Sequence, residues 1–473
     1  MVSVTRHNYN LPEDVLLEIF DAYRQLHELQ PDYEKVWNSR DGWFKLAHVC
    51  VHWRRIVFSS SSRLHVRLLF TPRRSSKDPV LSGLPHFPIL IDYRIQSWRT
   101  EKEETIGLAA IEQHRSRVRG IGIRSPYRPG LLKALSHPFP ELESFTMIGH
   151  LLPINDSVTD FLVALLSGSA SSLRRLMLQK VKLARLSPLL SSTTGLEKLT
   201  LTLWATPGTH LEVLLIPNLQ RMSCLHRLEL KFLMYDRVDA ASPNPLLPAG
   251  DILTLPRLTD FIFAGHSSYL QILATRLVAP SLQHLHAAYY NGENASSLLP
   301  QLCKFICYSE SHFKAILLYL GGRIVKFGAE TSSKSDHAEP AFRISIPAPT
   351  PWEQIGQIFA GPLSTVEELV IDSGFRESQQ DHINWRALFN YIPHVKIVQV
   401  HCHAALGVAD ALQLDGHGPA PDLLPFLERV EVECPSSIPR FSRNIPYEHI
   451  RDAFEPLIAA RQQVGRPIKL SRT

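Results

Sequence analysis

A short apolar pattern recurs along most of this chain and constrains the fold more than any other feature. The pattern is six residues long, with apolar residues at its first, fourth and sixth positions. Steps between successive copies are mostly 23 to 33 residues; one step is 53, and within it residues 342–346 alternate like a further strand. Eleven ordered copies indicate a structural repeat. They begin at Val118, Leu142, Leu173, Leu196, Leu225, Leu258, Leu282, Phe313, Val366, Val395 and Leu427.

Each copy predicts a short strand followed by a returning segment. The fourth and sixth residues point to one side of the strand, and the first closes the preceding turn. Stacked copies then bury a continuous ladder of apolar side chains. We predict an α/β fold of parallel strands with returning helices over residues 89–445, with Ile89–Tyr93 as a strand and Asp160–Ser167 and Trp385–Tyr391 as helices. The alternative is a mixed α/β domain whose leucines have this spacing by chance.

The pattern resembles a leucine-rich-repeat array with irregular repeat lengths. This resemblance implies a solenoid whose concave face binds another protein. Pro- and Ser-rich residues 236–251 and 330–351 are expected to loop out of it.

Two helical patterns precede the repeats. Residues 11–20 (LPEDVLLEIF) start with Pro12, which suits the first turn of a helix. Their apolar spacing predicts one stripe, formed by Val15, Leu16, Ile19 and Phe20. Residues 46–57 repeat this spacing with Leu46, Val49, Cys50, Trp53 and Val57.

Together these stretches resemble an F-box, and the order of F-box and repeats is similar to that of fungal F-box-like proteins. The matching residues are Leu11, Pro12, Ile19, Phe20, Val49, Cys50, Trp53 and Arg54, whereas His65 stands where the family carries Trp. The resemblance implies that residues 8–70 dock a Skp-type adaptor of a cullin–RING ubiquitin ligase. The predicted adaptor-binding residues are Leu11, Pro12, Val15, Leu16, Ile19, Phe20, Val49, Cys50 and Trp53.

We expect Pro12, Ile19, Phe20 and Trp53 to leave apolar surface for this partner. The alternative is an N-terminal cap packed on the next domain. Residues 71–88 are predicted to be a linker, and residues 446–473 a capping helix and tail whose end, GRPIKLSRT, is frayed.

Composition narrows the class of protein. The net charge of +5 is too small to indicate nucleic-acid binding without a clustered patch. The six cysteines are scattered, which favours reduced thiols in the cytoplasm and/or nucleus. The N-terminus lacks the apolar core of a signal peptide, and no apolar run reaches membrane-spanning length, so we expect no membrane association.

The sequence contains no strong candidate for a metal-binding or catalytic site. His394, His401, Cys402 and His403 form the best metal-like cluster, but no second ligand pair completes it, and Cys303 and Cys307 suit buried thiols better. The sequence contains no GxSxG, HExxH or phosphate-loop motif. We therefore predict no enzyme activity, no cofactor and no metal. Solvated faces explain the basic runs better than recognition of acidic or phosphorylated peptides; these runs contain Arg73, Arg74, Arg115, Arg117, Arg119, Arg174 and Arg175.

These patterns predict a substrate-recognition subunit of an SCF-type ubiquitin ligase, which binds a Skp-type adaptor and a target protein. The alternative is an interaction scaffold that delivers no ubiquitin.

Overall fold

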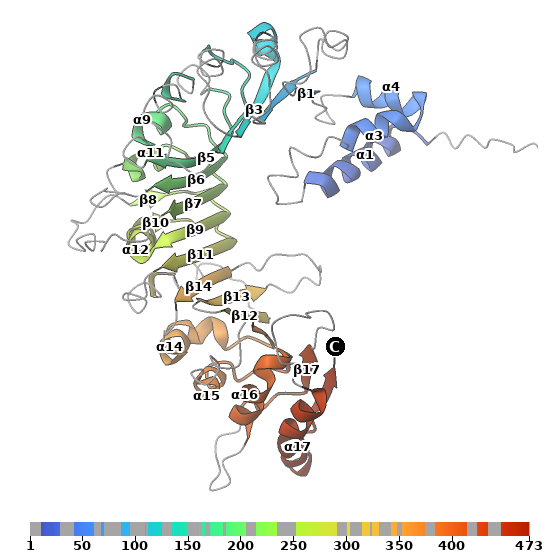
Figure 1. Cartoon of the computed structure of the whole chain (residues 1–473), viewed down its shortest axis with the longest axis vertical. Helices are drawn as coiled ribbons and strands as arrows, with labels where there is room; N and C mark the ends of the chain where they lie inside the picture. The colour runs from blue at the N-terminus through green and yellow to red at the C-terminus, as the bar shows by residue number, and fades with distance from the viewer. Residues whose placement is uncertain are drawn as a thin grey trace, which may run out of the picture. The chain divides into compact units, whose positions relative to one another are not determined.

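The computed structural model describes residues 11–28, 42–60, 68–70, 87–94, 109, 112–124, 135, 137–148, 160, 162–165, 171–182, 186–204, 214–233, 252–290, 300–302, 315–321, 324–330, 342–347, 352–373, 384–413, 423–433 and 446–472. Over these residues the chain is mixed α/β, with helices and long runs of parallel strands (Figure 1), which confirms the α/β class. The chain divides into two compact units. Unit 1 comprises residues 1–181 and 188–196, and unit 2 comprises residues 182–187 and 197–473.

The described residues of the N-terminal part of unit 1 include the helices α1 (Glu13–Glu28), α3 (Gly42–Val49) and α4 (Val51–Ser59). Both helical patterns of the sequence are therefore confirmed, but the second one is broken into two helices. The break lies at Cys50, whose backbone is extended and whose Sγ accepts a hydrogen bond from the Trp53 N–H at 3.4 Å. Cys50 thus caps α4, and α1 packs on both α3 and α4.

The described strands of unit 1 are parallel to one another and lie in the sheet in chain order. They are β1 (Leu68–Phe70), β2 (Ile89–Arg94), β3 (Val118–Arg124), β4 (Ser144–Ile148) and β5 (Arg175–Lys182). The predicted strand at residues 89–93 is confirmed as β2. Residues 68–70, which the sequence places at the end of the F-box-like segment, pair with this sheet as β1.

Unit 2 continues the same architecture. Its first strands, β6 (Lys198–Trp204), β7 (Arg227–Leu233), β9 (Asp260–His266) and β11 (His284–Tyr290), are parallel neighbours. Its last strands, β15 (Glu368–Ser373), β16 (Ile397–His401), β17 (Arg429–Glu433) and β18 (Lys469–Arg472), are parallel neighbours too. Two short strands, β8 (Leu253–Thr254) and β10 (Leu277–Val278), pair separately.

An antiparallel insertion interrupts this order between β11 and β15. It consists of β12 (Ala315–Gly321), β13 (Ile324–Glu330) and β14 (Phe342–Pro347), which lie in the sheet as β11-β14-β13-β12-β15. The expectation of parallel strands throughout is therefore wrong here. Only two residues separate β12 from β13, and so short a connection joins strands only in antiparallel fashion. Residues 342–346 do form a strand, but it lies beside β11.

One backbone hydrogen-bond pattern recurs from copy to copy in both units. The carbonyl of the second residue of a copy accepts from the second and third N–H groups of the next copy. His226 and Arg227 donate in this way to Glu197 at 2.8 and 3.1 Å, and Thr259 and Asp260 donate to His226 at 2.8 and 3.0 Å. This repeated bond fixes the register between neighbouring copies.

The core follows the predicted apolar positions. Leu199, Leu228, Phe261 and Leu285 lie opposite one another on β6, β7, β9 and β11, and each is at most 1% exposed. In seven of the eleven copies a further apolar residue lies three positions before the copy, and its carbonyl accepts a hydrogen bond from the first N–H of that copy. These residues, which the sequence pattern missed, are Phe139, Met222, Leu255, Ala279, Leu363, Ile392 and Leu424.

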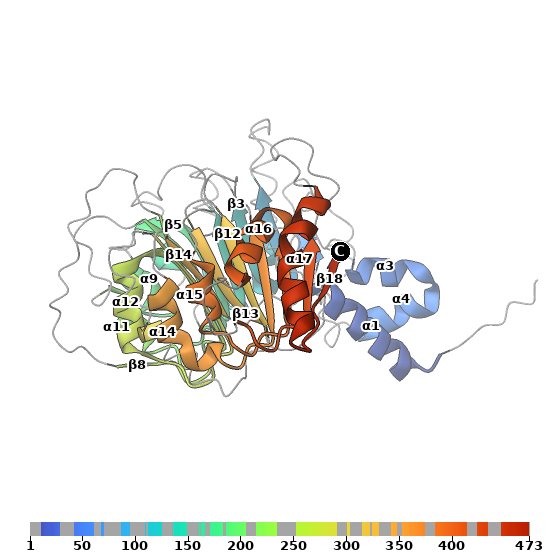
Figure 2. The same cartoon turned by 90° about the horizontal axis from the view of Figure 1, so that it is seen from below.

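Helices cover one face of the unit 2 strands (Figures 1 and 2). They include α11 (Ile216–Leu219), α12 (Ser267–Arg276), α14 (Trp352–Leu363), α15 (Trp385–Phe389) and α16 (Cys402–Leu412). On this face, Tyr269 of α12 stacks on Phe232 of β7 with ring centroids 4.8 Å apart. Because strand side chains alternate, the residues between the buried ones point to the opposite side. We call that side the polar sheet face; on β7 it carries Arg227, Glu229 and Lys231.

The C-terminal helix α17 (Tyr447–Gln463) coincides with the predicted capping helix. Its buried Arg461 donates through Nη2 to the carbonyls of Leu423 at 2.7 Å and Leu424 at 3.1 Å. The prediction of a frayed end is wrong, because residues 469–472 form β18 and Lys469 lies opposite Arg429 of β17. Backbone pairing therefore holds the end of the described chain.

Candidate functional site

The predicted docking stripe of α1 is divided between two faces of the helix. Leu11, Val15 and Ile19 are 42%, 40% and 41% exposed, whereas Leu16 and Phe20 are 1% and 0% exposed. Residues four apart share a helix face, so each set forms its own line along the helix. The expectation that Phe20 contributes exposed surface is therefore wrong, because Phe20 and Leu16 form the core between the helices.

Trp53 lies mainly with this core. Its ring contacts Phe20 edge to face, with centroids 4.9 Å apart, and thereby ties α4 to α1. Arg54 follows Trp53 and donates through Nε to the carbonyl of Ala47 at 2.9 Å, which ties α4 to α3. The sequence motif that contains Trp53 and Arg54 thus holds the three helices together, and Trp53 is only partly exposed.

The junction of α3 and α4 carries a second group of exposed apolar side chains. Val49 and Val51 are 59% and 76% exposed, and Cys50 between them is exposed as well. Sequence reasoning identified Val49 and Cys50 but missed Val51. The signal for Val51 was the helix break, since a residue that follows an N-cap starts a new helix and leaves the periodicity of the preceding one.

We call Leu11, Pro12, Val15, Ile19, Val49, Cys50 and Val51 the exposed apolar set. Pro12 is exposed at the start of α1, beside the exposed acidic residues Glu13 and Asp14. Acidic side chains in a first turn stabilise the helix through its dipole. On α4, Arg55 is exposed and its Nη2 lies 3.4 Å from His52 Nδ1. Charges of opposite sign therefore lie on α1 and α4.

The exposed apolar set consists of side chains of the kind that line protein-docking surfaces. Isolated apolar residues are common on surfaces, but grouped ones on a small helical segment are typical of interaction sites. The set carries no nucleophile–base pair. The residues that the structure describes also contain no group of three or more His, Cys, Asp or Glu placed to hold a metal ion.

The predicted metal-like cluster does not come together in its described part. His394 stacks on Phe426 with ring centroids 5.4 Å apart, and His401 Nδ1 lies 3.8 Å from the Sγ of its neighbour Cys402. The side chain of His403, together with Cys303 and Cys307, lies outside the described residues.

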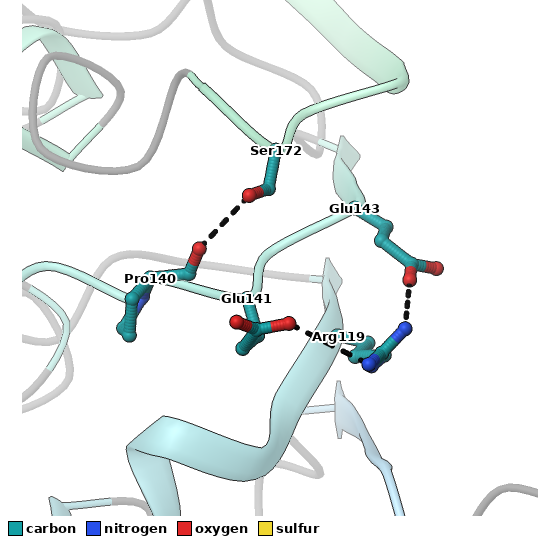
Figure 3. A network of polar contacts seen from close by, with 5 residues as sticks. All are labelled: Arg119, Pro140, Glu141, Glu143 and Ser172. Carbon is teal, nitrogen blue, oxygen red and sulfur yellow. Dashed lines mark hydrogen bonds and ion pairs between the residues drawn. The ribbon is translucent and has the colours of Figure 1, made fainter.

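Most described arginines of the basic runs hold structure together. Arg117 donates through Nε and Nη2 to the Phe87 carbonyl at 3.1 and 3.0 Å, and Arg174 donates to the Gly195 carbonyl at 3.2 Å. Arg119 of β3 forms ion pairs with Glu143 and Glu141, as Figure 3 shows. These contacts favour a structural role for the runs, while Arg73 and Arg74 lie outside the described residues.

Figure 3 also shows a hydrogen bond between neighbouring copies of the repeat: the Ser172 hydroxyl donates to the Pro140 carbonyl at 3.0 Å. The same bond recurs in unit 2, where Ser281 donates to the Pro256 carbonyl at 2.7 Å. Ser172 and Ser281 each precede the first residue of a copy, so this bond belongs to the repeat.

None of the helices in the described part of the chain combines the length and apolar content needed to cross a membrane. No protein-family model matches the chain, and a search of characterised proteins finds no match either.

Proposed function

We propose that the chain is the substrate-recognition subunit of an SCF-type cullin–RING ubiquitin ligase. In this proposal the three N-terminal helices form an F-box-like domain, and the strands from about residue 89 to 445 form a degenerate leucine-rich-repeat array that binds a target protein. The chain carries out no bond chemistry; it raises the effective concentration of target lysines near the ligase's conjugating enzyme.

The observation that carries the proposal is the division of α1. Leu16 and Phe20 are buried between the helices, whereas Leu11, Val15 and Ile19 remain about two-fifths exposed and contribute less to that core. Exposing them costs solubility unless a partner covers them. A Skp-type adaptor is the partner that the F-box resemblance implies, because the exposed residues coincide with the matched positions Leu11 and Ile19.

The repeated hydrogen bonds between copies support the second half of the proposal. In a repeat array each copy contacts mainly its neighbours, and the register is the same from copy to copy. The bonds from residues 226–227 to Glu197 and from residues 259–260 to His226 have this property. The antiparallel insertion β12–β14 makes the array a degenerate one.

Capture of the adaptor tests the proposal. Ile19→Asp places a charge in the exposed stripe and should reduce capture of a purified Skp-type adaptor at least about 30-fold, as for a central interface residue. Ile252→Asp is the matched control, since Ile252 is also exposed but lies in unit 2. Circular dichroism should show both variants folded.

Equal capture by Ile19→Asp and the unsubstituted chain would refute adaptor docking through α1. If the chain captures the adaptor and the cullin but supports no ubiquitin transfer to any captured protein, the interaction scaffold is the better description. A Trp53→Ala test is less informative, because Trp53 supports the core through Phe20.

A further inference from the structure

Two strands of unit 2 carry the same charged sequence on the polar sheet face. The copy that starts at Leu225 has Arg at its third position and Glu at its fifth, Arg227 and Glu229, and the copy that starts at Leu427 has Arg429 and Glu431. The apolar residues between them, among them Leu228 and Val430, are fully buried. Both Arg–Glu pairs therefore lie on equivalent sites of β7 and β17.

On β17 the pair is closed. Arg429 donates through Nη1 to Glu431 Oε1 at 2.9 Å, which is a charge-assisted hydrogen bond. The next residue on this face is Glu433, which adds a negative charge. The three side chains sum to −1 (Arg +1, Glu −1, Glu −1), and the arginine has its carboxylate partner.

On β7 the same pair is open. The next residue on the face is Lys231. Its Nζ lies 2.7 Å from Glu229 Oε1, so Lys231 forms the closer ion pair with this carboxylate. Arg227 Nη2 is left 3.9 Å from Glu229 Oε2, too far for a hydrogen bond. The three side chains sum to +1, and the side chain of Glu229 is 5% exposed against 30% for Arg227 and 47% for Lys231.

Two hydrogen-bond donors at this place lack acceptors. Arg227 Nε is buried and has no hydrogen-bond partner among the described residues, and the buried hydroxyl of Thr200 has none there either. Thr200 lies on β6 directly opposite Glu229, so both donors are on one face of adjacent strands. Buried donors without partners are rare and destabilising, which points to an acceptor that arrives from outside.

A nearby carboxylate does not supply that acceptor. Asp260 of β9 lies opposite Arg227 in the register, but its Oδ2 accepts from Thr259 Oγ1 at 2.6 Å. The described residues show no ion pair between Asp260 and Arg227. Among the described residues, the Arg227 guanidinium therefore has only the long ion pair with Glu229 at 3.9 Å.

We propose that Arg227, with Thr200 and Lys231 beside it, anchors a side-chain carboxylate from an acidic segment of the target protein on the polar sheet face. The guanidinium turns its donors from the distant Glu229 toward the incoming carboxylate, and Lys231 keeps Glu229 neutralised while it does so. This inference rests on the proposed function only in taking the array as the target-binding part.

Fluorescence anisotropy with labelled peptides tests the anchor on the full chain. Three Gly/Ser peptides of equal length carry four Glu, four phosphoserine or four Lys residues, and binding is measured in about 0.1 M salt, where surface charges still act over roughly 10 Å. The Glu peptide should bind. Arg227→Gln should weaken its binding about tenfold, the value of one charge-assisted hydrogen bond.

Arg429→Gln is the matched control, since it removes the equivalent arginine from the closed pair, and it should change binding less than about twofold. Two swaps sharpen the test. Lys231→Glu copies the β17 arrangement into β7 and should weaken binding, whereas Glu433→Lys copies the β7 arrangement into β17 and should strengthen it.

Equal losses in Arg227→Gln and Arg429→Gln would overturn the anchor, as would binding of the Lys peptide as tightly as the Glu peptide. Tighter binding of the phosphoserine peptide would overturn the assignment to a carboxylate. No step uses the adaptor, so a chain that captures the adaptor but ignores the Glu peptide would refute this inference alone.

Discussion

The N-terminal helices and the repeat strands of unit 2 use apolar residues in opposite ways. Along α1 the apolar residues form two lines, and one of them, with Val15 and Ile19, remains exposed. Along β6 to β11 the apolar residues at the fourth position of each copy, such as Leu199 and Phe261, are buried without exception. The difference indicates that burial within the fold accounts for these strand residues, whereas on α1 it accounts for Leu16 and Phe20 but not for Val15 and Ile19.

The largest test of this contrast compares truncation in the two regions. Phe261→Ala should lower the free energy of unfolding by about 3–5 kcal/mol, because Phe261 is fully buried and its removal leaves a cavity. Ile19→Ala should change it by less than about 0.5 kcal/mol, because Ile19 contributes little to the core. Hydrogen exchange measures both, since it reports the opening of each region separately. A comparable loss in Ile19→Ala would mean that the exposed line also stabilises the helices.

A second test concerns how closely the helices of unit 2 pack. Gly356 and Gly361 both lie in α14, but a Cβ on Gly356 would lie 1.9 Å from the ring of Tyr391, and a Cβ on Gly361 would meet nothing within 4 Å. Gly356→Ala should therefore lower stability by about 1–3 kcal/mol through overpacking. Gly361→Ala should raise it by up to about 1 kcal/mol, because alanine favours the helix. Thermal unfolding compares them; equal stability would show that Tyr391 moves aside.

The strand positions of the repeats were predictable from the sequence because their cause is local. A strand that alternates two buried residues with polar ones shows that period directly in its letters, as Leu199 and Leu201 do on β6. The helices Trp385–Phe389 and Tyr447–Gln463 were also predictable from local sequence, because their apolar residues recur at steps of three to four.

Features that depend on neighbours in space were not predictable in this way. The spacing of Val15, Leu16, Ile19 and Phe20 indicates an apolar stripe but does not say which half a neighbouring helix covers. The place of β14 beside β11 depends on a hairpin that reverses the chain. Strand β18 carries only one apolar residue, Leu470, so pairing with β17 rather than its own pattern defines it.

At the candidate sites, the sequence identified residue types but not their partners. Leu11, Ile19 and Val49 were predicted and are exposed, whereas Val51 was missed. The open pair at Arg227 cannot be recognised from the sequence, because Arg227 and Arg429 occupy the same position of their copies. The residue two places after each glutamate differs, Lys231 or Glu433, but the sequence does not give the distances: Lys231 lies 2.7 Å from Glu229, and Arg429 lies 2.9 Å from Glu431.

The smallest expected effect concerns an ionisable side chain that is partly buried in unit 1, in contrast to the exposed charges of α1. Partial burial, and then the positive charge of Arg117, lower the pKa of His114 below 6.5. The unfolded chain therefore binds a proton at His114 more readily than the folded chain does. Stability should fall as the pH drops below about 6.5, and this contribution ends once the pH is below the folded pKa.

His114→Gln removes this titrating group, so its loss of melting temperature between pH 7.5 and pH 5 should be slightly smaller than that of the unsubstituted chain. The effect is small because the imidazole is only partly buried, and solvent weakens the repulsion from Arg117. Arg117→Gln is no substitute for this variant, since it also removes two hydrogen bonds to the Phe87 carbonyl. If the melting temperatures of the two proteins shift identically with pH, the pKa of His114 is the same in the folded and the unfolded chain. Partial burial in unit 1 would then not affect its protonation.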